Sequence, residues 1–173
     1  MSSLMKKAKF LILGLICFIV LHLYFGFGNL LNYSFLDRQL MIENQFTNGY
    51  VSERMRWLHF FAWTPTNVAG LFASSIGLYL AYQAHRGNFF TIGFGLGLWY
   101  LGVAVIIAGL TDMMARSIVP HILSAENPAG QVPISLFFSA EIFGLVFCGF
   151  GFLAMGNTML EATRLSEENK GFV

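Results

Sequence analysis

Three charged residues lie within or beside long apolar runs of the sequence and are the first candidates for chemistry: Asp112, Arg116 and Glu141. A charge inside a membrane is costly unless it is paired, hydrated or neutralised, so such residues are often functional. Asp112 and Arg116 stand four positions apart, in the acid-first order that favours an ion pair on a helix. Arg116 could instead reach Glu141 on a neighbouring helix. We expect this polar cluster to clamp the helices together, and a rim that binds an anion or a lipid head group is the alternative.

Glu141 has two interpretations. In the first, it is an intramembrane carboxyl group that takes up and releases protons. The chain would then be a small transporter or channel subunit that uses Glu141 with Arg116 and Asp112, which is the alternative to the function proposed below. In the other interpretation Ser139 caps a helix, and Glu141 lies in the first turn, where the helix dipole favours an anion. We favour the cap, because an apolar span of roughly 20 residues can be counted after Ser139. Residues 132–138 would then form an extended segment over the mouth of the bundle.

Histidine and cysteine do not follow the spacing of a known site. The chain has four histidines and two cysteines, which are His22, His59, His85, His121, Cys17 and Cys148. We place His22 and His59 at different depths of their spans, and His121 in a loop after Pro120, so two of them do not face each other across a haem. HxxxH, HExxH, CxxC, P-loop and nucleophile-elbow patterns are missing from the sequence. We therefore predict no catalytic residue, no metal ligand and no cofactor. A haem-binding redox subunit stays as a further alternative, beside a regulatory protein and a transporter or channel subunit.

Composition indicates which elements position these residues. The 173 residues are 56% apolar and only 11% charged, with a mean hydropathy of +0.64. Average soluble domains carry about 25% charged residues, so we expect a lipid bilayer to surround this chain. Four apolar segments reach the roughly 20 residues that a transmembrane helix needs, at about 8–31, 57–82, 90–110 and 140–160. The predicted fold is all-α: residues 1–173 form one transmembrane four-helix bundle with a short hairpin and two longer external loops.

The basic residues orient these spans. Lys and Arg number six on the side of the termini and the hairpin at 83–88, against four on the side of the loops at 32–56 and 111–139. By the positive-inside rule both termini and the hairpin are cytoplasmic. The formal net charge of +1 argues against direct binding of nucleic acid.

Small residues recur four positions apart in the predicted spans, a spacing that allows helices to approach closely. The pairs are Ala69 and Ala73, Gly70 and Ser74, Gly93 and Gly97, and Gly144 and Cys148. Pro65 removes one backbone hydrogen bond from the second span and should kink it. We expect Thr64, Thr66 or Asn67 to bond the freed carbonyl.

Two stretches of the chain are distinctive: the hairpin RGNFFT at 86–91, and the run from Asn127 to Val173, which ends in a tail with Glu167, Glu168 and Asn169. They resemble a bacterial family catalogued as domain of unknown function 2975, over roughly the last 120 residues. Members of this family are small four-span proteins with a similar hairpin and a Glu-Glu-Asn tail. The family has no assigned reaction or cofactor, and its members are often encoded beside small helix-turn-helix regulators.

The residues and the resemblance together predict a non-enzymatic, multi-pass protein of the bacterial inner membrane with an accessory, regulatory or sensor role. The resemblance implies a cytoplasmic partner such as a small helix-turn-helix regulator. The candidate partner surface consists of Arg86, Asn88, Glu167, Glu168 and Asn169. Association with further copies of the chain is left open.

Overall fold

The computed structural model describes residues 12–17, 19–21, 23–24, 53–124 and 136–170, and all regular secondary structure within them is helical. The long helices of this part are α3 (Glu53–His85), α4 (Ile92–Ser124) and α5 (Ala140–Lys170). The described residues between 12 and 24 are also helical. The all-α fold class is therefore confirmed. Most of the first predicted span and of the loop at 32–56 lies outside the described residues.

Helices α4 and α5 continue beyond the segments predicted at 90–110 and 140–160. Helix α4 includes Asp112 and Arg116 and runs through Pro120 to Ser124. The prediction that His121 lies in a loop is therefore wrong, because one proline near the end of α4 does not stop the helix. With 33 residues and a rise of 1.5 Å per residue, α4 is about 50 Å long. This length exceeds the roughly 30 Å hydrocarbon core of a bilayer.

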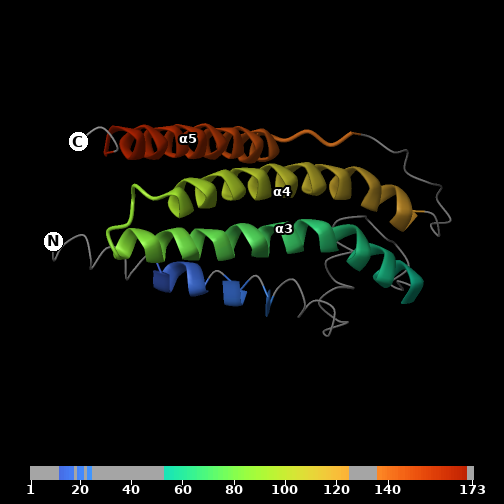
Figure 1. The fold of residues 1–173 in the computed structure, drawn as a ribbon. Helices are drawn as coiled ribbons and strands as arrows, with labels where there is room; N and C mark the ends of the chain where they lie inside the picture. The colour runs from blue at the N-terminus through green and yellow to red at the C-terminus, as the bar shows by residue number, and fades with distance from the viewer. Residues whose placement is uncertain (1–11, 18, 22, 25–52, 125–135, 171–173) are drawn as a thin grey trace.

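The helices lie side by side in a row (Figure 1). Helix α4 packs against both α3 and α5, whereas α3 and α5 have no comparable contact with each other. The helical residues near the N-terminus lie on the side of α3 opposite to α4 (Figure 1), where the side chain of Leu15 is 3.5 Å from the position that a Cβ would take on Gly77. The described part of the chain is thus a layer of adjacent helices with two broad open faces.

The core of this layer is thin and consists mostly of small side chains. The buried apolar residues are Ala69, Leu80, Ala81, Leu98, Ala104, Ala115, Val119 and Ile142. Large apolar side chains lie at the surface instead; Phe90 is 78% exposed and Phe147 is 80% exposed. Soluble proteins seldom expose so much contiguous apolar surface, whereas helices that face lipid do so along their length.

Glycines set the interface between α4 and α5. A Cβ on Gly102 would lie 2.6 Å from the carbonyl oxygen of Gly149, and a Cβ on Gly156 would lie 2.7 Å from the backbone nitrogen of Trp99. The two backbones are therefore in direct contact, as in close packing of membrane helices. The contacting glycines on each helix are seven residues apart: Gly95, Gly102 and Gly109 on α4, and Gly149 and Gly156 on α5. Residues at this spacing stay on the side of a helix that faces its partner.

The pair that the sequence predicted on α5, Gly144 and Cys148, does not face α4. A Cβ on Gly144 would have no neighbouring atom within 4 Å among the residues that the structure describes, and Cys148 is exposed. This prediction is wrong because it followed a four-residue spacing, whereas the contact repeats every seven residues. Gly97 does pack closely against another helix, since its Cβ would lie 2.7 Å from Cδ2 of Leu80 on α3.

Pro65 lies inside α3, and the N-terminal part of this helix bends away from the line of the remainder (Figure 1). The hydroxyl of Thr64 donates to the carbonyl of Phe60 at 2.8 Å. That carbonyl is one position before the one that Pro65 frees. The buried hydroxyl of Thr66 has no hydrogen-bond partner among the described residues. The bend is thus explained by the proline, while Thr64 and Thr66 do not bond the freed carbonyl.

The turn between α3 and α4 is determined by local sequence. Gly87 has a positive φ of 80°, a conformation that glycine adopts without steric cost. The amide of Gly87 donates to the carbonyl of Ala84 at 3.1 Å, and the amide of Asn88 donates to that of Gln83 at 3.0 Å. These are the two bonds of a Schellman motif. Thr91 then caps α4, because its hydroxyl accepts the amide of Phe94 at 3.2 Å.

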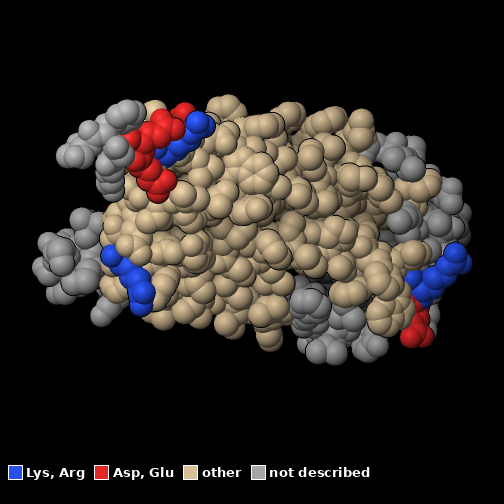
Figure 2. Space-filling model, in the orientation of Figure 1, with Lys and Arg blue, Asp and Glu red and all other residues tan. Residues whose placement is uncertain are grey.

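Two of the described helices, Ile92–His121 within α4 and Ala140–Asn169 within α5, are long and apolar enough to cross a membrane. Helix α3 has the length, but Thr, Asn and Ser residues near its middle make it less apolar. It still has no Asp, Glu, Lys or Arg between residues 57 and 85. On the face shown in Figure 2, the charged residues gather at the two ends of the molecule and leave an uncharged band between them.

Candidate functional site

The candidate polar cluster is built around Arg116. Its Nε donates to Oδ2 of Asp112 at 2.8 Å, one turn earlier on α4, and the Asp112 side chain is only 14% exposed. The guanidinium carbon lies 5.8 Å from the ring centre of Trp63 on α3 and 5.6 Å from that of Phe137 before α5. Both distances are in the range of a cation–π contact. Arg116 therefore contacts its own helix α4, helix α3 and the segment before α5.

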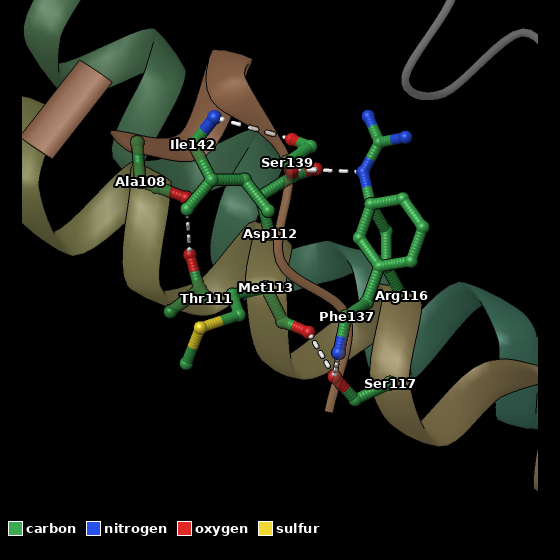
Figure 3. A network of polar contacts seen from close by, with 9 residues as sticks. All are labelled: Ala108, Thr111, Asp112, Met113, Arg116, Ser117, Phe137, Ser139 and Ile142. Carbon is green, nitrogen blue, oxygen red and sulfur yellow. Dashed lines mark hydrogen bonds and ion pairs between the residues drawn. The ribbon is translucent and has the colours of Figure 1, made fainter. Parts of the chain in front are cut away.

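Ser117 attaches the segment before α5 to α4. Its hydroxyl donates to the carbonyl of Met113 at 2.7 Å and accepts the backbone amide of Phe137 at 2.8 Å (Figure 3). Residues 136–139 are not helical, as expected for the end of the predicted extended segment; residues 132–135 lie outside the described part. The bond from Phe137 holds its ring beside Arg116, so Ser117 helps to position the cluster.

Ser139 caps α5. Its hydroxyl accepts the amide of Ile142 at 3.3 Å, and its carbonyl accepts the amide of Phe143 at 3.2 Å. Glu141 therefore lies in the first turn of the helix, where its side chain is exposed. Within the described residues Glu141 forms no ion pair, and Arg116 pairs with Asp112 instead. The structure thus brings together two members of the candidate cluster and leaves Glu141 outside it.

Replacement of Ser139 by alanine should lower the free energy of unfolding by about 1 kcal/mol, because the amide of Ile142 loses its acceptor. Ser139→Asp should restore most of this loss, since a carboxylate also caps a helix and suits the positive end of its dipole. Unfolding of the detergent-solubilised chain, followed by circular dichroism, measures both. Equal losses in the two variants would show that the cap does not act through its oxygen.

The residues of the candidate partner surface lie at one end of the row, here called the hairpin end, which comprises residues 83–91 and the last turns of α5 (Figure 1). The guanidinium of Arg86 lies 4.8 Å from the ring centre of Tyr82. Asn88 donates through Nδ2 to Oε1 of Gln83 at 3.1 Å. On α5, Arg164 donates through Nε to Oε1 of Glu168 at 3.0 Å. The side chains of Glu167 and Asn169 are exposed on the same helix, which continues to Lys170.

The cluster around Arg116 connects α3, α4 and the segment before α5. The sequence interpretation missed Trp63, Phe137 and Ser117, because they come from different elements and share no spacing with Arg116. Among the described residues, no group of three His, Cys, Asp or Glu side chains is placed to hold a metal ion. No family model, no curated protein and no solved structure matches the chain, so its function has to be inferred from these contacts and from the sequence itself.

Proposed function

We propose that this chain is a non-enzymatic, multi-pass protein of the bacterial inner membrane, an accessory or regulatory component that binds a cytoplasmic partner through its hairpin end. The observation that carries the proposal is the position of Arg86 and Asn88 at the same end of the row as Glu167, Glu168 and Asn169, beyond an uncharged band (Figures 1 and 2). Two segments far apart in sequence thus place polar side chains at the same end of the molecule, outside the part that suits a bilayer. Both termini would share this cytoplasmic side.

Local contacts hold the backbone and two side chains of the hairpin in place, and such preorganisation lowers the entropic cost of association. The Schellman turn fixes the backbone at Gly87, and contacts to Gln83 and Tyr82 orient Asn88 and Arg86. The adjacent acids at the end of α5 complement a basic protein surface. Helix-turn-helix proteins carry such a surface where they contact DNA, and the family resemblance suggests a regulator of this kind.

Transport through Glu141 receives less support from the contacts. Its side chain is exposed in the first turn of a capped helix, where a carboxylate is stable without a proton-transfer role. The charges that would accompany it, Asp112 and Arg116, are paired with each other. A structural clamp therefore describes Asp112 and Arg116 better than a conduction path.

Affinity purification of the tagged chain in a mild detergent tests the proposal. We expect a cytoplasmic protein to copurify, and Glu167→Lys with Glu168→Lys to reduce its recovery at least about tenfold, as expected when charge complementarity is reversed. Glu53→Lys is the matched control, because it changes an exposed acid at the opposite end of α3 and should leave recovery unchanged. Recovery of the chain alone, or equal losses in both variants, would contradict the proposal.

The placement in the membrane needs a separate test. Alkaline carbonate should leave the chain in the membrane pellet, and cytoplasmic reporters fused to either terminus should both be active. Activity of the two fusions in opposite compartments would exclude the four-span arrangement.

A further inference from the structure

An open groove of about 710 Å³ runs between α3 and α4 on one face of the row. Its walls include Val68, Phe72 and Tyr79 from α3, and Leu96 and Tyr100 from α4. Ser75 also lines the groove, but its hydroxyl already donates to the carbonyl of Leu71 at 2.8 Å. The groove therefore presents aliphatic and aromatic carbon to whatever occupies it, with few polar atoms.

The length of the groove matches one leaflet of a bilayer. Val68 and Tyr79 mark its ends along α3, and 11 positions at 1.5 Å per residue correspond to about 16 Å. The hydrocarbon core of a bilayer is about 30 Å thick. A groove of this length, starting near the hairpin end and following the helix axis, has the direction and depth of an acyl chain in the adjacent leaflet.

At the hairpin end of the groove, Tyr79 belongs to a short series of hydrogen-bonded polar side chains. The hydroxyl of Tyr79 accepts Nε2 of Gln83 at 2.9 Å, and Oε1 of Gln83 accepts Nδ2 of Asn88 at 3.1 Å. Arg86 directly follows the last residue of α3, and its guanidinium group lies over the ring of Tyr82. It forms no ion pair with another described residue. Arg86 follows Tyr79 by seven residues, which corresponds to about 10 Å along the helix axis, and a cation at that level complements an anionic phospholipid.

We propose that the groove binds one acyl chain of an anionic glycerophospholipid from the leaflet at the hairpin end, with the lipid phosphate at Arg86. This inference rests on the membrane placement in the proposed function, but it does not depend on a protein partner. The aromatic rings of Phe72, Tyr79 and Tyr100 pack along the acyl chain of the lipid, and Arg86 selects the charge of its head group. The acyl chain would fill the space between α3 and α4, and the lipid phosphate would contact Arg86, which also belongs to the surface proposed for the partner.

Native mass spectrometry of the full-length protein in detergent tests the groove, with dioleoyl phosphatidylglycerol and dioleoyl phosphatidylcholine added at equal concentration. We expect one retained lipid, mostly phosphatidylglycerol. Ser75→Phe should weaken binding of both lipids about tenfold by filling the groove. Its matched control is Thr158→Phe, at an exposed position on α5 where the native hydroxyl also bonds only its own helix, and this variant should bind as the native chain does. Arg86→Gln should keep the acyl-chain site but lower the preference for phosphatidylglycerol about fivefold.

Equal retention of the two lipids by the native protein would overturn the assignment of the phosphate to Arg86. Unchanged lipid binding in Ser75→Phe, or the same loss in Thr158→Phe, would overturn the assignment of the groove to a lipid. Dissociation of a dimer by Ser75→Phe would also overturn it, because a second copy of the chain would then occupy the groove. Ser75 lies in the uncharged band, away from the partner surface. Loss of lipid in Ser75→Phe without loss of the copurifying protein would therefore separate this inference from the proposed partner.

Discussion

Replacement of Gly156 by isoleucine should lower the free energy of unfolding by about 3 kcal/mol, the upper end of the usual cost of overpacking. A Cβ at this position would lie 2.7 Å from the backbone nitrogen of Trp99 and 3.0 Å from the carbonyl oxygen of Gly95. Both atoms belong to the backbone of α4, so a change of side-chain rotamer cannot relieve the clash. The helices would have to separate along the whole seam. Titration with dodecyl sulfate in mixed micelles, followed by tryptophan fluorescence, measures the effect.

Gly151→Ile is the matched control for this prediction. Gly151 lies on the same helix, and a Cβ there would have no neighbouring atom within 4 Å in the described part of the molecule. Because isoleucine favours a helix over glycine by roughly 0.5 kcal/mol, this variant should be as stable as the native chain or slightly more stable. A similar loss in both variants would mean that α5 does not pack on α4 through Gly156.

The difference between these two glycines shows why the helix packing could not be predicted from the sequence. Helix α5 is apolar on almost every side, so its pattern does not indicate which face is buried. In lipid the buried face is chosen by the fit of small residues, and both Gly144 and Gly156 are small. The four-residue spacing therefore selected the wrong face. The order of α3, α4 and α5 in the row depends on the same choice at each interface.

Local features were predictable, because all their determinants lie within a few residues. The cap at Ser139, the hairpin around Gly87 and the ion pair between Asp112 and Arg116 each follow from short spacings and are present in the structure. The contacts of Arg116 with Trp63 and Phe137 join residues distant in sequence. They become visible only once α3, α4 and the segment before α5 are placed together.

Replacement of Ser117 by valine should lower the free energy of unfolding by about 2–3 kcal/mol. Ser117 is only 6% exposed, so the larger side chain has to displace its neighbours. The backbone amide of Phe137 would also lose the hydroxyl that it now bonds at 2.8 Å. The segment at 136–138 should then detach from α4 and move the ring of Phe137 away from Arg116. Hydrogen exchange at the Phe137 amide should accelerate at least about tenfold, as expected for a loss of 1.4 kcal/mol in local protection.

Two alanine variants separate the hydrogen bond from the change in volume. Ser117→Ala removes only the hydroxyl and should cost about 1 kcal/mol with the same acceleration of exchange. Ser74→Ala is the matched control, because Ser74 is also 6% exposed and its hydroxyl also donates to a carbonyl one turn earlier, that of Gly70, at 2.8 Å. Within the described part of the chain Ser74 accepts no bond from another segment, so loss of its hydroxyl should change stability little and leave exchange at Phe137 unaltered. If exchange at Phe137 were the same in all three variants, Ser117 would not attach this segment to α4, and the clamp at Arg116 would have to form without it.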